Sequence, residues 1–381
     1  MRIYLDHNAT TPVRPEVVEV MDRVLREVFG NPSSVHAEGV RAREELETAR
    51  ARCAALVGAA PEEVIFTAGA TEANHLALLG IAGRPDRPGR HLVSTCAEHP
   101  SVEAPLARLE GEGFEVTRLP VDRRGLVDPA ELEAALRPDT ALVSILWANN
   151  ETGVIQPMEV LAGIVRDRGI PLHVDATQAL GKIPVDLERV PADLLSASAH
   201  KLGGPKGTGM LVRRRGVRLE PLLRGGGQER GLRGGTENVA GAAGFGLACE
   251  LAARELEERG RRYAALRDRL WEGLRRAVPD ARWNGAPAPV LPNTLNVCFP
   301  GASGELLLQA LDLEGVAASA GAACHSGAVE PSAVLLAMGL APEEAACSLR
   351  LSVGHGVDEA QIDRVLDILP RLVARAREAA A

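Results

Sequence analysis

The chain is constrained most by a regular alternation of short β-rich runs and helical stretches between about residues 14 and 260. The runs are bounded by Gly, Pro or polar residues and cover 64–67, 91–96, 115–119, 141–147, 171–174 and 194–197. Strands that alternate with helices build βαβ units, in which helices cover both faces of a mostly parallel sheet. We therefore predict an α/β fold whose chemistry lies in the connections at the carboxyl ends of the strands.

A second, smaller α+β domain is predicted beyond a long helical stretch at about 238–277. Strand-like and helical patterns continue towards the C-terminus, and a loop of small residues at 320–330 contains Cys324. With 381 residues, the chain is long enough for one large and one small domain. We place the large domain at residues 14–259 and the small domain at residues 1–13 plus 260–381.

The composition argues against several classes of function. The net charge of −8 provides no cationic field for nucleic-acid binding. No apolar run has the length of a membrane span or of a signal peptide, so we expect a cytoplasmic protein that does not bind membranes. The six cysteines are scattered without a C-x-x-C pair, which argues against a metal site and fits reduced thiols.

Two charged residues at neighbouring strand ends suggest the chemistry. Asp175 closes the apolar run 171–174, and Lys201 follows the run 194–197. Pyridoxal 5′-phosphate (PLP) needs an acid that keeps its pyridine nitrogen protonated and a lysine that binds it covalently. The chain has two other lysines, but Lys182 lies in the loop after Asp175 and Lys206 in a Gly-Pro-Lys-Gly turn. Lys201 is therefore the best candidate.

A seat for the cofactor's phosphate is predicted directly after the run 64–67. Residues 69–74 open a helix there, and its free N–H groups with the Thr71 hydroxyl would bind an anion.

The usual nucleotide-binding motifs are incomplete in this sequence. Gly181-Lys182 is followed by Ile183 instead of Ser or Thr, and the glycine run from Gly225 lacks the last glycine of G-x-G-x-x-G. A nicotinamide-binding enzyme is therefore disfavoured.

Several motifs in one order along nearly the whole chain resemble the cysteine desulfurases of the NifS/IscS type, which are class V aminotransferase-like PLP enzymes. They include Tyr-Leu-Asp-His-Asn-Ala-Thr-Thr at 4–11, His-Val-Asp-Ala-Thr-Gln at 173–178 and Ser-Ala-Ser-Ala-His-Lys at 196–201. The other matching stretches are 31–36, 68–74, 98–102, 149–153, 202–207, 225–236, 323–326 and 349–352. The resemblance implies PLP fold type I, with a sheet of the seven-stranded type in the large domain.

The resemblance also implies how the cofactor is held. Lys201 would bind PLP and shuttle the α-proton, Asp175 would pair with the pyridine nitrogen, and Gln178 would bond the ring hydroxyl. His99 would stack on the ring and relay protons. The phosphate would be bound by residues of several loops, and Thr236 would reach the phosphate of a partner subunit in a homodimer. The phosphate-binding residues are Ala70, Thr71, Ser198, His200 and, across the dimer, Thr236.

The implied reaction removes sulfur from L-cysteine. Asn150 and Arg350 would bind the substrate carboxylate, a role that suits the bidentate geometry of arginine. The Cys324 thiolate would attack the substrate sulfur, so that L-alanine leaves and Cys324 holds a persulfide. An acceptor such as an iron–sulfur scaffold protein would then take the sulfur for iron–sulfur cluster or other thio-cofactor biosynthesis. The usual family motif Ser-Gly-Ser-Ala-Cys-Thr-Ser is Ala-Gly-Ala-Ala-Cys-His-Ser here, so His325 stands beside the thiol.

Other interpretations compete with this one. A selenocysteine lyase or an aminotransferase would share the fold, and an aminotransferase needs no nucleophilic cysteine. A catalytically silent scaffold for sulfur-transfer partners would release no alanine. Cys324 could also be a small packing residue, as we expect for Cys53, Cys96, Cys249, Cys298 and Cys347. Cys324 differs because it lies in a Gly/Ala/Ser loop.

Overall fold

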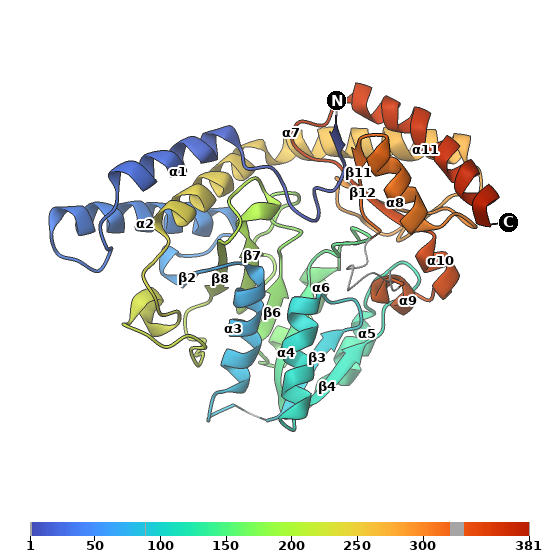
Figure 1. Cartoon of the computed structure of the whole chain (residues 1–381). Helices are drawn as coiled ribbons and strands as arrows, with labels where there is room; N and C mark the ends of the chain where they lie inside the picture. The colour runs from blue at the N-terminus through green and yellow to red at the C-terminus, as the bar shows by residue number, and fades with distance from the viewer. Residues whose placement is uncertain (1, 88, 321–330, 381) are drawn as a thin grey trace.

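The computed structural model describes residues 2–87, 89–320 and 331–380 and has a seven-stranded sheet at its centre (Figure 1). The strands lie in the order β2-β8-β7-β6-β5-β3-β4. β8 pairs antiparallel with β2 and β7, and the other four pairs of described strands in this sheet are parallel, which confirms the predicted α/β fold with a mostly parallel sheet. The strands are β2 (Val64–Thr67), β3 (His91–Thr95), β4 (Glu115–Leu119), β5 (Thr140–Leu146), β6 (Leu172–Asp175), β7 (Leu194–Ser198) and β8 (Gly209–Arg213).

Six of these strands correspond to the predicted runs, within one residue at either end for most of them. β8 was missed because its apolar part, Met210-Leu211-Val212, lies between a glycine and a series of arginines. So short an apolar run carries little periodicity, and its place in the sheet comes from pairing with β2 and β7.

Helices cover both faces of the sheet, as alternating side chains require. Leu92 and Leu142 point to the face covered by α3 and α4, whereas Val93 and Val143 point to the face covered by α2, α5, α6 and part of α7. No helix among the described residues is both long and apolar enough to cross a bilayer. The helices of this region are α1 (Pro15–Glu27), α2 (Ala37–Leu56), α3 (Ala70–Ala82), α4 (Pro100–Gly111), α5 (Pro129–Ala135), α6 (Met158–Asp167) and α7 (Val239–Ala277).

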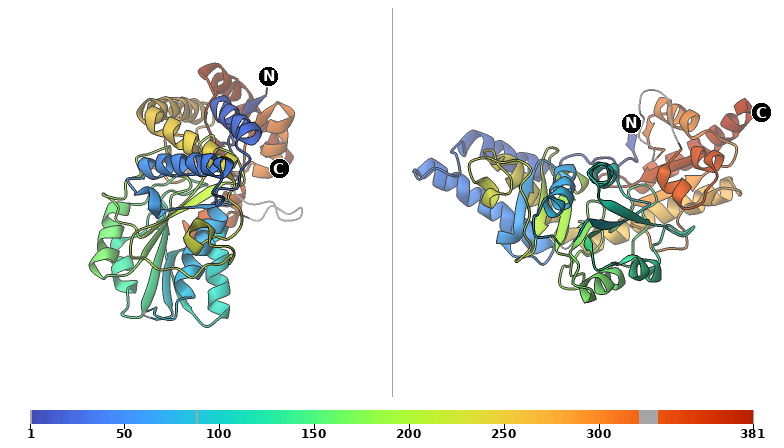
Figure 2. Two further views of the ribbon diagram at one scale, coloured as in Figure 1. Left: turned by 90° about the vertical axis from the view of Figure 1, so that its left-hand side faces the viewer. Right: turned by 90° about the horizontal axis from the view of Figure 1, so that it is seen from below.

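The C-terminal region adds two small sheets and a further group of helices beside the second half of α7 (Figure 2). β10 pairs antiparallel with β9 and β12, and β1 at the N-terminus pairs parallel with β11. The strands are β1 (Ile3–Tyr4), β9 (Arg282–Trp283), β10 (Thr294–Cys298), β11 (Val316–Ala317) and β12 (Ser348–Ser352). The helices are α8 (Gly304–Leu313), α9 (Ala333–Ala337), α10 (Pro342–Ala346) and α11 (Glu359–Ala380).

We propose that the chain divides into domains near residue 260, with residues 1–13 joining the C-terminal part. The hydrophobic clusters support this division. One cluster unites Ile3 and Leu5 with Leu270 of α7, Leu351 of β12 and Ile368 of α11, whereas the first half of α7 packs against the large sheet. The long helix α7 therefore contributes to both cores, and Figure 1 shows it spanning the two regions.

The glycine-rich loop after β8 is fastened to the large sheet by a buried ion pair. Glu229 accepts hydrogen bonds from both Nη atoms of Arg50 at 2.8 and 3.0 Å and from the backbone N–H of Phe66 at 3.0 Å. The two charged side chains are only 2% and 4% exposed. Glu229 and its neighbour Arg230 have φ of 45° and 58°, in the left-handed region that non-glycine residues rarely adopt. The ion pair therefore holds a strained turn in the loop that carries Thr236.

We expect Glu229→Ala to lower the free energy of unfolding by about 3–5 kcal/mol, because the buried Arg50 would lose its buried carboxylate and keep only the exposed one of Glu47. Urea denaturation followed by circular dichroism measures this change. The control is Asp363→Ala, which removes the exposed partner of Arg269 and should cost no more than about 1 kcal/mol. Equal losses in the two variants would contradict the role given to the buried pair.

Candidate active site

The predicted functional residues meet at the carboxyl edge of the large sheet. Asp175 ends β6, Lys201 follows β7 through a short 3₁₀ turn, and His99 follows β3. Because parallel strands end at the same edge, these side chains come together although they are far apart in the sequence. Seven predicted residues line one pocket of about 420 Å³: His99, Asn150, Asp175, Gln178, His200, Lys201 and Arg350.

A second hollow continues from this pocket along the ends of β2 and β7. It contains three more of the predicted residues, Ala70, Thr71 and Ser198, and it shares His200 with the first pocket. Its floor is the N-terminus of α3, where the N-cap Gly69 has no side chain to occupy the first N–H groups. The helix end is therefore open to an anion.

Glycines make room for an anion at this helix end. A Cβ on Gly209 would lie 2.6 Å from the backbone of Gly69, so only glycine allows β8 to pass this close to the loop. A Cβ on Gly69 would in turn lie 3.9 Å from the Ser198 hydroxyl oxygen, in the space between the helix and β7. The bare backbone here leaves room for a phosphate-sized group next to Ser198.

Asp175 is buried at the other end of the site, and two neutral donors hold it. Its Oδ2 accepts from the Asn74 amide at 2.8 Å, and its Oδ1 accepts from the Thr177 backbone N–H at 2.9 Å. The residue is 6% exposed, and no cationic side chain of the described residues lies within salt-bridge distance of its carboxylate. A buried carboxylate without a cation is costly, so this group is suited to bind a protonated ring nitrogen.

Lys201 lies between these two ends. Its Nζ donates to the backbone carbonyls of Asn8 at 2.6 Å and of Ala9 at 2.8 Å. Burial, followed by the charge of the nearby Arg350, lowers the pKa of Lys201 from its ordinary 10.5 to about 8. Its amine is therefore neutral more readily than that of a surface lysine, as nucleophilic attack on an aldehyde requires.

The amide of Gln178 is oriented by a lysine whose role the sequence analysis missed. Lys182 is buried, and its Nζ donates to the side-chain oxygens of Gln178 and Asn8. Because Nζ of Lys182 donates to the side-chain oxygen of Gln178, the NH₂ group of Gln178 points away from Lys182. One of these N–H bonds reaches the Asn8 carbonyl at 2.9 Å, which leaves the second for another acceptor.

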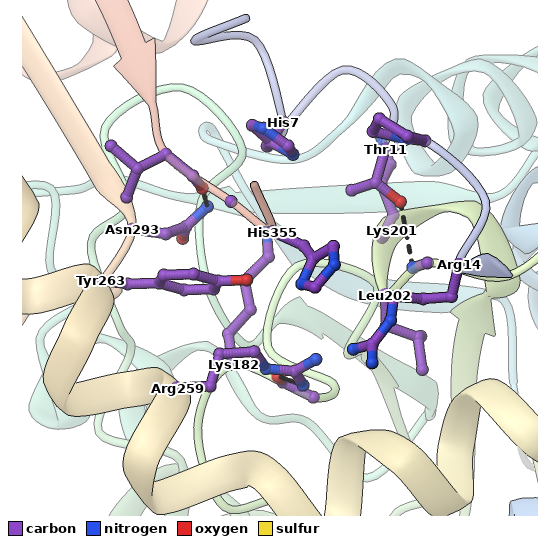
Figure 3. Close-up of a pocket in the computed structure, with 15 residues that line it drawn as sticks. His7, Thr11, Arg14, Lys182, Lys201, Leu202, Arg259, Tyr263, Asn293 and His355 are labelled. Atoms are coloured by element: carbon purple, nitrogen blue, oxygen red, sulfur yellow. Dashed lines mark hydrogen bonds between the residues drawn. The ribbon is translucent and has the colours of Figure 1, made fainter. Parts of the chain in front are cut away.

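A small cavity of about 40 Å³ lies behind Lys201, on the side that Lys182 faces (Figure 3). Arg14 and Arg259 also line it. Burial is the main cause that lowers the pKa of Lys182 well below its ordinary value, and the charges of Lys201, Arg350 and Arg259 add to it. Neighbouring cations therefore favour neutral amines in this part of the site.

The two histidines of the site are held in neutral forms. His99 is the N-cap of α4, and its Nδ1 accepts from the Ser101 backbone N–H at 3.1 Å. Burial lowers its pKa, which leaves an uncharged ring suited to stacking on an aromatic cofactor. Burial and the charge of Lys201 lower the pKa of His200 to about 4, and its Nδ1 shares a 3.0 Å hydrogen bond with the Thr10 hydroxyl.

Arg350 enters the pocket from the C-terminal region. It lies on β12, and its side chain is 5% exposed. One Nη donates to the Asn150 carbonyl at 3.0 Å, and the other donates to the Asp6 carboxylate at 2.7 Å. Its Nε has no hydrogen-bond partner among the described residues. Asn150 therefore contacts Arg350 through its backbone carbonyl. The carboxylate partner of Arg350, Asp6, was not among the site residues predicted from the sequence.

Two predicted site residues are not brought into these pockets. Thr236 is exposed on the loop before α7 and lines neither hollow. Cys324, the predicted nucleophile, lies outside the described residues, as does His325. Their roles stay predictions. Among the described residues, no cluster of three or more His, Cys, Asp or Glu side chains could hold a metal ion.

These features fit PLP as the cofactor. The buried Asp175 carboxylate would face the pyridine nitrogen, the free N–H of Gln178 would bond the ring hydroxyl, and Lys201 would bind the aldehyde carbon. The open helix end at Gly69 and the Ser198 hydroxyl would bind the phosphate. Each polar group of the cofactor thus meets a residue of matching chemistry.

Comparison with known proteins gives a consistent result. The family described as aminotransferase class V matches residues 3–365. The chain is 46% identical to the cysteine desulfurase IscS of Methanosarcina thermophila and 44% identical to that of Dictyoglomus turgidum, over 98% of this chain and 93% and 95% of those proteins. A solved NifS-like protein superimposes with a TM-score of 0.93 at 39% identity, over 98% of this chain and 100% of its own. The structure of SspA in complex with cysteine superimposes with a TM-score of 0.83 at 34% identity, over 93% and 99% of the chains.

The lowered pKa of Lys201 predicts how the cofactor-free protein captures PLP. The covalent capture rate should rise with pH and level off above about 8, where the amine is neutral, instead of rising to 10.5 as for an ordinary lysine. At pH 6 the rate should be roughly 100-fold below the plateau, because each pH unit changes the neutral fraction tenfold. Stopped-flow absorbance between pH 6 and 10 measures this profile. A midpoint near 10, or covalent capture by Lys201→Ala, would contradict the assignment.

Proposed function

The chain belongs to the class V aminotransferase family and is a PLP-dependent cysteine desulfurase, and we propose that it moves the sulfur of L-cysteine onto Cys324 and releases L-alanine. The observation that carries this proposal is the meeting of three groups in one pocket: the amine of Lys201, the carboxylate of Asp175 and the guanidinium of Arg350. The first two suit the cofactor, and the third suits the carboxylate of an amino acid.

PLP, when bound, withdraws electrons from the α-carbon of the amino acid and makes its bonds easier to break. Asp175 supports this by keeping a proton on the pyridine nitrogen, since its two donors hold the carboxylate in place. His99, whose pKa is lowered by burial, would stack a neutral imidazole on one face of the ring. Ala70, Thr71, Ser198 and His200 hold the phosphate at the N-terminus of α3.

Arg350 and Asn150 orient the substrate. The guanidinium is already fixed by two hydrogen bonds, so it binds the substrate carboxylate without losing further side-chain freedom. This places the α-carbon of cysteine towards Lys201, which lines the same pocket. With a pKa of about 8, the Lys201 amine would accept the α-proton and return it later.

Cys324 completes the reaction as a thiolate. It forms an S–S bond with the substrate sulfur while the Cβ–S bond of the substrate breaks. The electron pair of that bond stays on the carbon, which takes a proton and leaves within L-alanine. Cys324 is left as a persulfide, and a sulfur acceptor such as an iron–sulfur scaffold protein takes the outer sulfur atom.

We further propose that the enzyme is a cytoplasmic homodimer in which Thr236 reaches the phosphate bound to the partner subunit. Two observations support the dimer. Thr236 is exposed on a loop that Glu229 anchors. Apolar side chains on and after α1 are also unusually exposed, with Leu25 at 68%, Phe29 at 77% and Val35 at 92%. A second copy of the chain would cover such a surface.

The first experiment mixes the PLP-loaded protein with L-cysteine and a thiol reductant and quantifies alanine and sulfide. We expect equal amounts of both products, and we expect Cys324→Ala to bind PLP normally but to form neither product. A PLP-loaded wild type that forms no alanine would overturn the activity. If Cys324→Ser kept full turnover with an amino acid, an aminotransferase would be favoured instead.

The proposed role of Arg350 is tested with two ligands that differ only by a carboxylate. L-alanine has the group that Arg350 would bind, and ethylamine lacks it. We expect Arg350→Gln to weaken L-alanine binding to the PLP-loaded protein roughly 10- to 100-fold, the value of a charge-assisted hydrogen-bond pair, while ethylamine binding stays unchanged. Titration followed by the cofactor's absorbance measures both affinities. A similar loss for both ligands would show that Arg350 does not contact the carboxylate.

A further inference from the structure

A carboxylate from the N-terminal segment lies against the proposed substrate-binding arginine. Asp6 Oδ1 is 2.7 Å from an Nη of Arg350, and the side chains are 20% and 5% exposed. Asp6 comes shortly after β1, and its backbone forms a bridge with Ser352 of β12, two residues beyond Arg350. Backbone pairing therefore fixes where this carboxylate lies relative to the arginine.

Arg350 can hold Asp6 and a second carboxylate at the same time. A guanidinium has five N–H donors, and Asp6 and the Asn150 carbonyl take one each. The Nε donor has no partner among the described residues. Three donors thus remain for a ligand, and a substrate carboxylate need not displace Asp6. It would, however, bind next to a negative charge that is already there.

We propose that Asp6 is a positioning and specificity-determining residue, which orients Arg350 and offsets its charge so that an amino-acid carboxylate binds weakly enough for the product to leave. This inference deepens the proposed function and rests on the proposed role of Arg350. Asp6 acts through Arg350, so its effect should depend on whether the ligand has a carboxylate.

The same pair also influences Lys201. Arg350 lowers the pKa of Lys201, whereas the charges of Asp175 and Asp6 raise it. The nearby Lys182 is buried, and its own pKa is lowered mainly by that burial and then by the charges of Lys201 and Arg350. Removing the Asp6 charge should therefore make the Lys201 amine neutral at a lower pH. This readout requires no turnover, and a residue with a purely structural role would not change it.

The decisive variant is Asp6→Asn, which keeps an oxygen that can accept from Arg350 but removes the charge. We expect L-alanine to bind the PLP-loaded protein about 3- to 10-fold more tightly, because one like charge near the ligand is gone, and ethylamine to bind as before. The matched control Asp363→Asn removes the same charge from an exposed pair with Arg269 and should change neither affinity.

The pH midpoint of PLP capture by the cofactor-free protein is measured in parallel. The midpoint should fall below the wild-type value in Asp6→Asn and remain at the wild-type value in Asp6→Glu, which keeps the charge. Equal weakening of L-alanine and ethylamine, or an unchanged midpoint in Asp6→Asn, would overturn the inference. If Arg350→Gln weakens the binding of L-alanine and ethylamine equally, the proposed role of Arg350 itself is wrong. If Arg350→Gln behaves as expected and Asp6→Asn does not, only the role of Asp6 is wrong.

Discussion

Asn8 connects the parts of the molecule that form the site. It is 1% exposed, and its backbone and side chain bond to both the large sheet and the small domain. Its carbonyl accepts from Gln178 and Lys201, and its side-chain oxygen accepts from Lys182 and Asn293. Its N–H groups donate to Ser352, Asn150 and Thr294. A buried polar residue is tolerated only when its groups are paired, so these partners have to stay where they are.

This arrangement explains why the N-terminal segment belongs with the site. The carboxylate of Asp6 accepts a hydrogen bond from Arg350. The carbonyls of Asn8 and Ala9 accept from Lys201, and the Thr10 hydroxyl forms a hydrogen bond with His200. The segment crosses from β1 in the small domain to α1 over the large one, and it contacts the proposed cofactor lysine and the proposed substrate arginine on the way. The proposed cofactor and substrate sites are therefore linked by a few consecutive residues.

The amount of burial, more than the number of charges, sets the electrostatics of the pocket. Burial is the largest cause of the lowered pKa of Lys201, His99 and His200. It also raises the pKa of Glu151 to about 7 at the edge of the pocket. Lys201 and Glu151 thus titrate near neutral pH, as proton transfer between substrate and protein requires. The charged Arg350 remains as the anchor for an anionic group.

The sequence by itself determined the α/β fold, the positions of most strands along the chain and the likeness to PLP enzymes, because these depend on local periodicity and on short motifs. Asp175 and Lys201 could be identified because strand ends place their residues at one known edge of a sheet. Only the tertiary structure decided the roles of Asp6, Asn8 and Lys182. No local pattern indicates that Asp6 meets Arg350, 344 residues away, or that Lys182 orients Gln178. Such contacts arise from packing two domains against one loop, and burial then changes the chemistry of each group.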